Sequence, residues 1–377
     1  MKIPILRIPY DYEDIVFIKD EIEKVLKSGY LTMAENVRKF EREFADYVGV
    51  KYAVGTNSGT SSLEIFLRAI DVRNSSVIVP SNTFMATPIA VVHAGGKVIF
   101  ADCEKENLQI DPDDLKRKIR NDTKAVIVVH IGGIISPRFD ELRQICKELK
   151  LFLLEDAAHA HGATFRGKQA GTLGHAGSFS FYPTKVLTTA EGGMLTTDDD
   201  FIYEQALILR EHGKKDHNFN VHTEFGYNWR FSEIHAVLGL QQMKKISWIL
   251  SERRRIAAYY DKNIKRVKNV EPINIPAHVR SSYYKYVVFL GRGLNRTRIK
   301  EKLKEKYDIV LPGEVYSDPC HSQPVFQKYP ETVANSVNDV FPNTEYVCAN
   351  QICLPLYPGL SENELEYIMV ALEDCIK

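Results

Sequence analysis

The sequence has neither a long hydrophobic run nor an excess of charge of one sign. None of its apolar stretches approaches the roughly 18–20 residues that a membrane-spanning helix needs. Lysine plus arginine and aspartate plus glutamate count 49 each, so the charge balance suggests neither a nucleic acid nor a membrane surface as a partner. The N-terminus, MKIPILRIPYDYED, lacks the apolar core of a secretory signal. We therefore expect a soluble, cytoplasmic protein.

The chain also lacks the cysteine spacings of disulfide-rich and zinc-binding proteins. Its six cysteines are scattered, and none belongs to a Cys-x-x-Cys pair. Cys320 and His321 are neighbours, but two adjacent ligands do not make a tetrahedral zinc site. Neither a Gly-x-Gly-x-x-Gly fingerprint nor a Walker Gly-Lys-Ser/Thr motif occurs. We expect reduced thiols, no metal site and no nucleotide site of those two kinds.

What the sequence does contain is an alternation of short apolar runs and amphipathic helical patterns up to about residue 200. Runs rich in β-branched residues lie at 77–79, 98–100, 125–129 and 151–154. Such strands, separated by helices, predict an α/β fold with a mostly parallel sheet covered on both faces. After about residue 240 come a long helix, strand-like runs at 283–290 and 309–311, and a helix from Glu362. We expect a large domain over 1–240, with an N-terminal arm, and a smaller α/β domain over 241–377.

The segment GTNSGTSSLEIFLRAID (55–71) predicts a helix that begins near Gly59 and Thr60. From Leu63 onwards its apolar residues recur at i, i+3, i+4 and i+7. Small residues at a helix start leave backbone N–H groups free to face an anion, and the helix dipole adds attraction for a phosphate. A plain helix capped by a hydroxyl side chain has the same pattern, so this segment alone leaves both interpretations open.

The segment LFLLEDAAHAHGA (151–163) places two acids directly after an apolar strand. Because ligands of open α/β sheets bind at the carboxyl ends of the strands, Asp156 is a candidate binding residue. A role as the N-cap of a following helix explains an aspartate there equally well. His159 and His161 are candidate ligands too, although a histidine at a strand end is more often a hydrogen-bonded packing residue.

The segment GSFSFYPTKVLTTAEGG (177–193) continues a strand-like run, Ser178 to Tyr182, into a single lysine. A lysine in a partly dehydrated pocket has a lowered pKa and becomes an amine nucleophile, whereas a lysine on a loop is usually just solvated. A phosphate-binding helix start, an aspartate at a strand end and a pocket lysine are together the parts that a pyridoxal phosphate (PLP) enzyme needs. Lys185 would form the Schiff base, Asp156 would keep the pyridine nitrogen protonated, and the helix start would bind the phosphate.

The order of these and further motifs resembles the DegT–DnrJ–StrS family of sugar-nucleotide aminotransferases, which are fold-type I PLP enzymes. The similarity extends from about residue 5 to the C-terminus, through NSGTSSL (57–63), VPSNTFMAT (79–87), EDAAHAHGA (155–163), GSFSFYPTKVLTTAEGGML (177–195), GYNWRFSEIHAVLGLQQM (226–243), HSQPVF (321–326) and CLPLYPGLSENE (353–364). It implies a seven-stranded, mostly parallel sheet between helices in the large domain. It also implies that PLP and its amino form (PMP) are the cofactor.

The resemblance implies cofactor contacts beyond Lys185 and Asp156. Gly59, Thr60 and Ser180 are expected to bind the phosphate. Phe84 would stack on the pyridine ring through its flat π face. His159 stands where the family has glutamine or histidine near the ring hydroxyl.

Further contacts are implied around the sugar and across a subunit interface. Asn228 would reach the phosphate of the neighbouring subunit, which makes a homodimer with shared active sites the expected unit. Tyr316, His321 and Arg230 are candidates for the sugar site. The basic run Arg253–Arg255 is either a contact for a nucleotide diphosphate or a solvated helix face.

The chain departs from the family pattern at three places, none of which removes a catalytic group. Ala190 and Ala34 stand where the family usually has glycine, and the usual His-x-Tyr-Gly is His130-Ile-Gly-Gly133 here. Residues 29–34 and 130–134 are expected to help shape the sugar pocket. The identity of the sugar therefore does not transfer from any relative.

The function implied is transfer of an amino group from L-glutamate, or L-glutamine, to a nucleotide-linked 3- or 4-ketosugar. The setting would be bacterial amino-sugar biosynthesis, for surface polysaccharides such as the O-antigen of lipopolysaccharide or for natural-product glycosylation. One alternative is a ketosugar dehydratase of the same family, but those that remove a C3 hydroxyl carry histidine in place of the lysine. A non-catalytic cofactor-binding regulator is the other, and the intact Lys185, Asp156 and Thr60 argue against it.

Overall fold

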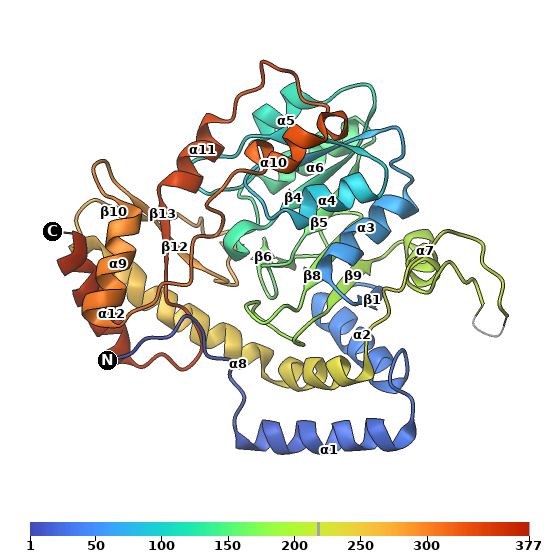
Figure 1. The fold of residues 1–377 in the computed structure, drawn as a ribbon, viewed down its shortest axis with the longest axis horizontal. Helices are drawn as coiled ribbons and strands as arrows, with labels where there is room; N and C mark the ends of the chain where they lie inside the picture. The colour runs from blue at the N-terminus through green and yellow to red at the C-terminus, as the bar shows by residue number, and fades with distance from the viewer. Residues whose placement is uncertain (217–218, 377) are drawn as a thin grey trace.

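The computed structural model describes residues 1–216 and 219–376 and is built around a seven-stranded sheet (Figure 1). Its strand order is β1 (Tyr52–Thr56), β9 (Gly193–Thr197), β8 (Ala176–Ser180), β5 (Phe152–Asp156), β4 (Thr123–Val129), β2 (Ser76–Pro80) and β3 (Lys97–Ala101). From β8 to β3 neighbouring strands are parallel, and within this sheet only β9 runs opposite to the other strands, so that it pairs antiparallel with both β1 and β8. The predicted α/β fold with a mostly parallel sheet is confirmed.

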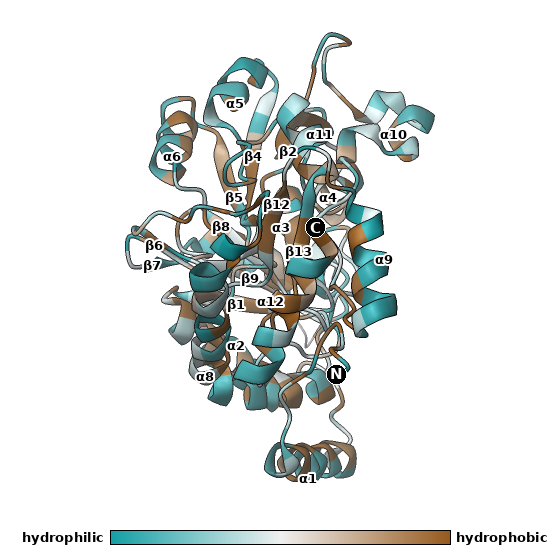
Figure 2. Cartoon of the chain, turned by 90° about the vertical axis from the view of Figure 1, so that its left-hand side faces the viewer, coloured by the Kyte–Doolittle hydropathy of each residue, from teal (hydrophilic) through white to brown (hydrophobic). Residues whose placement is uncertain are grey.

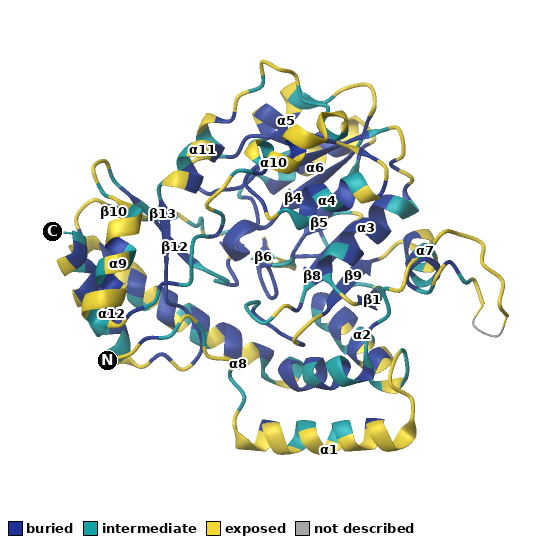
Figure 3. Cartoon of the chain, in the orientation of Figure 1, coloured by how far each residue is buried: buried dark blue, intermediate teal, exposed yellow. Residues whose placement is uncertain are grey.

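Helices cover both faces of this sheet, because successive side chains of a strand point to opposite sides. One face carries α3 (Gly59–Ala69), α4 (Ala86–His93) and α7 (Asp200–Arg210), and the other carries α2 (Glu35–Val48), α6 (Phe139–Glu148) and the first half of α8 (Glu233–Asn263). On β2, Val77 and Val79 pack toward the first group and Ile78 toward the second. Figures 2 and 3 show the result: hydrophobic, buried strands beneath helices with hydrophilic, exposed outer faces.

The 31-residue helix α8 joins two hydrophobic cores. Its first half packs on the large sheet through Leu240 and Ile249, and its second half enters a separate core through Ile256 and Tyr260. That smaller core is formed with the antiparallel sheet of β10 (Val270–Pro272), β12 (Tyr286–Leu290) and β13 (Gln351–Leu354), and with α9 (Arg296–Tyr307) and α12 (Glu362–Ile376). The predicted boundary between 240 and 241 falls inside α8 and stays a prediction.

The predicted strand at 309–311 is wrong, because Ile309 makes only an isolated bridge to Ile3. Beyond it the chain returns to the large sheet and forms α10 (Pro324–Lys328) and α11 (Pro342–Ala349). Phe326 packs edge-on against Phe100, with ring centroids 5.1 Å apart, and Val333 pairs with Val98. The Cys320 N–H donates to the carbonyl of Ser81, just past the end of β2, at 2.9 Å, so the stretch that leads into α10 lies at the carboxyl ends of the parallel strands.

Two elements extend from the body of the molecule. Figure 1 shows α1 (Tyr12–Ser28) running alongside α8, and the segment after α7 projecting to the side. Tyr12 and Leu26 on α1 are exposed, and Phe225 in the projecting segment is 95% exposed. Among the described residues no helix is both long and apolar enough to span a membrane.

Candidate active site

A cavity of about 710 Å³ opens at the carboxyl ends of β5 and β8. Its floor comes from the large domain: the start of α3, the end of β5 and the loop after β8. Its opposite wall comes from segments 284–285 and 312–323. Of the predicted site residues, eight line it: Gly59, Thr60, Phe84, Asp156, His159, Ser180, Lys185 and Tyr316.

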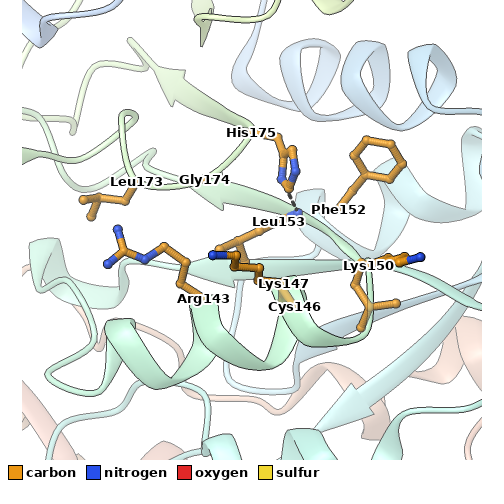
Figure 4. A pocket seen from close by; sticks show the side chains of 10 residues that line it. Arg143, Cys146, Lys147, Lys150, Phe152, Leu153, Leu173, Gly174 and His175 are labelled. Carbon is orange, nitrogen blue, oxygen red and sulfur yellow. Dashed lines mark hydrogen bonds between the residues drawn. The ribbon is translucent and has the colours of Figure 1, made fainter.

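A second hollow, of about 470 Å³, lies at the amino ends of β5 and β8 (Figure 4). It is lined by basic side chains of α6 and the following turn, among them Arg143, Lys147 and Lys150. Its His175 accepts a hydrogen bond from the Leu153 backbone N–H at 3.0 Å. None of the predicted site residues lies in this hollow, so the chemistry belongs to the larger cavity.

The start of α3 forms an anion-binding corner of the cavity. The hydroxyl of Ser58 caps the helix by accepting from the Ser61 N–H at 3.1 Å. The N–H groups of Gly59 and Thr60 lie in the first turn, where the helix itself offers no acceptor. A side chain at Gly193 would lie 2.3 Å from the Ser58 carbonyl, so only glycine lets β9 approach the helix start this closely. The capped helix is therefore present, and its first residues, Gly59 and Thr60, also line the cavity together with Ser180, as a phosphate-binding helix start would.

Asp156 ends β5 with its carboxylate inside the protein. Its Oδ2 accepts from the Thr87 hydroxyl at 2.8 Å and its Oδ1 from the Ala158 N–H at 3.2 Å. Burial raises the pKa of Asp156, while those two hydrogen bonds and the charge of Lys185 oppose the rise. The N-cap interpretation is wrong, because no helix begins in the described segment 157–163.

Lys185 lies in the loop after β8, which ends at Ser180, two residues earlier than predicted. The Thr188 hydroxyl donates to the Phe181 carbonyl at 3.0 Å, and the Thr189 hydroxyl donates to the Glu191 carbonyl at 2.7 Å. The threonines around the lysine therefore hold the loop in shape. The pKa of Lys185 is lowered to about 8, mainly by desolvation; the charge of Asp156 opposes this lowering and the positive charge of Lys285 adds to it. The interpretation of Lys185 as a solvated surface lysine is wrong.

A row of four stacked rings crosses the cavity. Phe84 stacks on Tyr316 at 6.5 Å between centroids, Tyr316 on His159 at 5.9 Å, and His159 on Tyr284 at 4.0 Å. Burial lowers the pKa of His159 well below its usual value, and the charges of Lys185 and Lys285 act in the same direction. Phe84 is 64% exposed, which leaves its ring free to contact a bound molecule. Sequence reasoning missed Tyr284, whose hydroxyl bonds that of Thr184 at 3.1 Å.

Three predicted residues lie outside this cavity. Asn228 is exposed on the projecting segment, and Arg230 pairs with Glu211 at 2.6 Å. His321 bonds the Ser81 hydroxyl at 2.6 Å through Nδ1 and stacks on Phe341 at 4.2 Å. Within one subunit these side chains do not join the cavity.

Glu155, next to Asp156, was also missed, and it organises the opposite face of β5. Its carboxylate accepts the N–H groups of Gly171, Leu173 and Gly174 and bonds His130 Nε2 at 2.8 Å. Four partners offset the cost of burying this charge. Successive side chains of a strand point to opposite faces. The Glu155 carboxylate therefore holds the backbone of the fold, while the Asp156 carboxylate faces the cavity.

Arg253 corrects a different prediction. It lies buried in α8 and donates to the Tyr283 carbonyl at 3.0 Å, and to the carbonyls of Tyr284 and Leu356 at longer distances. It is neither a solvated residue nor a contact in the cavity. Arg254 and Arg255 likewise donate to backbone carbonyls, those of Gly162 and Leu360.

The residues present fit PLP. One cavity holds an N–H corner for a phosphate, a buried carboxylate for a pyridine nitrogen and a lysine of lowered pKa for an aldehyde. The close contact at Gly193 supports the same fit, because a methyl group there would displace the start of α3 and its N–H groups. Comparison with known proteins then decides the family: residues 13–373 match the model of the DegT/DnrJ/EryC1/StrS aminotransferase family. The chain belongs to this family.

Curated and structural relatives agree with this family assignment. The chain is 32% identical to the GDP-perosamine synthase of Caulobacter vibrioides over 90% of its length and 89% of that protein. It is also 32% identical to the dTDP-3-amino-3,6-dideoxy-alpha-D-galactopyranose transaminase of Aneurinibacillus thermoaerophilus, over 94% of each chain. The structure of NtdA from Bacillus subtilis with bound PMP matches with a TM-score of 0.90 and 26% identity, covering 100% of this chain and 85% of that one. The protein is a PLP-dependent aminotransferase.

Proposed function

We propose that this aminotransferase moves an amino group from L-glutamate, or L-glutamine, to a nucleotide-linked 3- or 4-ketosugar. The observation that carries the proposal is the single cavity that combines Lys185, Asp156 and the α3 N-terminus with a second wall of polar and aromatic side chains. The relatives named above make amino sugars linked to GDP or dTDP, which supports the substrate class. The product would enter bacterial amino-sugar biosynthesis, for a surface polysaccharide or a glycosylated natural product.

The residues on the cofactor side of the cavity then have defined tasks. Bound PLP supplies a ring that accepts the electron pair released at the carbon next to the nitrogen. Lys185 holds the cofactor through its amine and, once displaced by the donor, its free Nζ takes the proton from the donor's α-carbon. Asp156 keeps the proton on the pyridine nitrogen, and the N–H groups at Gly59 and Thr60 hold the phosphate. The second half-reaction uses the same residues in reverse order on the ketosugar.

The proposed unit is a homodimer in which Asn228 serves the neighbouring subunit's site. Asn228 is exposed and does not line its own cavity, while the segment that carries it is anchored on α3. Arg68 donates to the Tyr227 hydroxyl at 2.8 Å, and Tyr227 stacks on Trp229 at 4.4 Å. In mixtures of Lys185→Ala and Asn228→Ala chains, shared sites predict partial recovery of activity, because one site per mixed dimer is intact. Mixtures that stay inactive would contradict the shared site.

A panel of nucleotide-linked 3- and 4-ketosugars tests the substrate class. L-glutamate should remove the visible absorbance of the bound PLP, and one member of the panel should restore it. D-glutamate serves as the control donor, because its α-proton points away from the face that Lys185 occupies. If simple 2-oxo acids restore the absorbance and every ketosugar fails, the sugar assignment is wrong.

A further inference from the structure

Lys285 is a second lysine in the cavity, and the tasks above do not use it. It lies at the entry to β12, on the wall opposite the cofactor residues, and its Nζ donates to the Pro312 carbonyl at 2.7 Å. Its Nζ is 5.5 Å from the centroid of the Tyr284 ring, and the Nζ of Lys185 is 5.0 Å from the same centroid. The two ammonium groups are therefore no more than about 10.5 Å apart, the sum of these distances.

The charge of Lys285 is not neutralised by the protein. Lys185 and Lys285 are the only lysines or arginines among the described residues that line the cavity. Within the described chain no carboxylate forms a salt bridge with Lys285, and the nearby Glu314 instead pairs with Lys300 at 2.8 Å. An ammonium group has three donors, and the Pro312 carbonyl uses one. A half-buried cation with spare donors can take further acceptors, and an anion from outside the chain is the partner that its charge favours most.

The backbone around Lys285 is fixed before any substrate arrives. The Ser282 N–H donates to the Gly133 carbonyl at 3.0 Å, and the Ser282 hydroxyl donates to the His159 carbonyl at 2.7 Å. Gly133 has φ +86°, and a side chain there would lie 2.1 Å from the Ser282 hydroxyl. Gly133, a position at which the usual family pattern also has glycine, therefore lets this segment approach His159. Buried Arg253 holds the Tyr283 carbonyl from the other side.

We propose that Lys285 is a specificity-determining residue that binds a carboxylate of the amino donor. Once Lys185 holds the cofactor, Lys285 is the one lysine or arginine left among the described residues that line this subunit's cavity. An amino acid donor carries at least one carboxylate close to its reacting nitrogen. The diphosphate of a nucleotide-linked sugar is a less suitable partner, because the sugar ring separates it from the keto carbon. The inference rests on the proposed function, since it takes the donor to be L-glutamate or L-glutamine, each of which carries a carboxylate beside its reacting nitrogen.

The test separates the two half-reactions in the holoenzyme. Lys285→Met removes the charge at similar volume, and Lys285→Arg keeps it. We expect Lys285→Met to lower kcat/KM for the L-glutamate half-reaction roughly 10- to 100-fold, with Lys285→Arg recovering most of it. Calorimetric binding of glutarate, an unreactive dicarboxylate, should weaken by a similar factor. Lys306→Met is the matched control, because that lysine belongs to the same domain and pairs on the surface with Asp374.

The return half-reaction shows whether Lys285→Met folds and binds its cofactor. At a pH well above 8, where the Lys185 amine is neutral, the PMP form should react with the ketosugar within about twofold of the wild-type rate, because the proposed contact is absent there. Unchanged glutarate affinity in Lys285→Met overturns the proposal, and so does a defect confined to the ketosugar step, which would assign Lys285 to the diphosphate. If the wild type reacts with L-glutamate but with no ketosugar, the sugar assignment fails while the carboxylate test still stands.

Discussion

The two walls of the cavity differ in what they are made of. On the large-domain wall the groups that fit the cofactor are backbone N–H groups, glycines, the Asp156 side chain at the end of β5 and the Lys185 side chain in the loop after β8. On the opposite wall, segments 284–285 and 312–323 present side chains such as Tyr284, Lys285 and Tyr316, held by contacts that run to distant parts of the chain. The first wall suits a cofactor of constant shape, and the second suits a substrate that varies.

The difference shows where specificity can change without loss of chemistry. A substitution on the large-domain wall disturbs phosphate, ring or aldehyde contacts, and so affects both half-reactions. A substitution on the opposite wall touches one substrate at a time, because donor and acceptor occupy the site in turn. The largest expected difference in activity is between substitutions of the two lysines.

Lys185→Ala should abolish turnover with every donor and acceptor, lowering kcat by about 10⁴-fold or more, because it removes both the amine and the proton carrier. Lys285→Met is the matched control, since it removes the other lysine of the cavity and should affect the donor step alone. Steady-state assays with each half-reaction measured separately make the comparison. Multiple turnovers by Lys185→Ala would refute the role of that lysine.

The contrast also explains which parts the sequence could predict. Lys185, Asp156 and the Gly59–Thr60 helix start follow from local patterns, because strand ends and helix starts lie in fixed places on a parallel sheet. Tyr284 and Lys285 stand in YYKYVV, which predicts a strand and nothing more. Their side chains reach the cavity only because Ser282 and Arg253 bond residues far away in the sequence. Arg253 shows the same limit, since its basic run predicted solvent or a diphosphate and its partners are buried carbonyls.

Gly193→Ala tests the backbone contacts of the large-domain wall. The added carbon would lie 2.3 Å from the Ser58 carbonyl and 2.5 Å from the Gly59 nitrogen, so the start of α3 must shift. We expect the affinity of the apoenzyme for PLP to fall at least about tenfold, because the N–H corner moves relative to Asp156. Gly55→Ala on the neighbouring strand is the control, because its nearest contacts are 3.4 Å away. Equal PLP affinities of the two variants, from titration of apoenzyme, would contradict the N–H corner.

The pH dependence of cofactor attachment tests how the two walls act on Lys185. Only the neutral amine attacks an aldehyde, and the pKa of Lys185 is lowered to about 8. The rate at which apoenzyme takes up PLP should therefore rise with pH and level off above about 8. Lys285→Met should move this midpoint up, because Lys285 lowers the pKa, and Asp156→Asn should move it down, because Asp156 raises it. Midpoints that shift together in one direction would show that neither charge sets the pKa.

The smallest effect is expected at Ala190, in the loop that carries Lys185. Its φ of +70° is left-handed, a conformation that strains any residue with a side chain. Glycine relieves this strain but also has more freedom in the unfolded chain, which reduces the gain. The net effect of Ala190→Gly should be to raise the free energy of unfolding by about 0.5–1 kcal/mol. Ala277, which is exposed and has no such φ, is the control, and Ala277→Gly should lower the free energy of unfolding slightly. If Ala190→Gly is more stable and keeps its PLP affinity, the close contacts of Gly193 position the cofactor-binding residues, and the strain at Ala190 does not. A loss of affinity in a more stable variant would show that the strained loop itself positions Lys185.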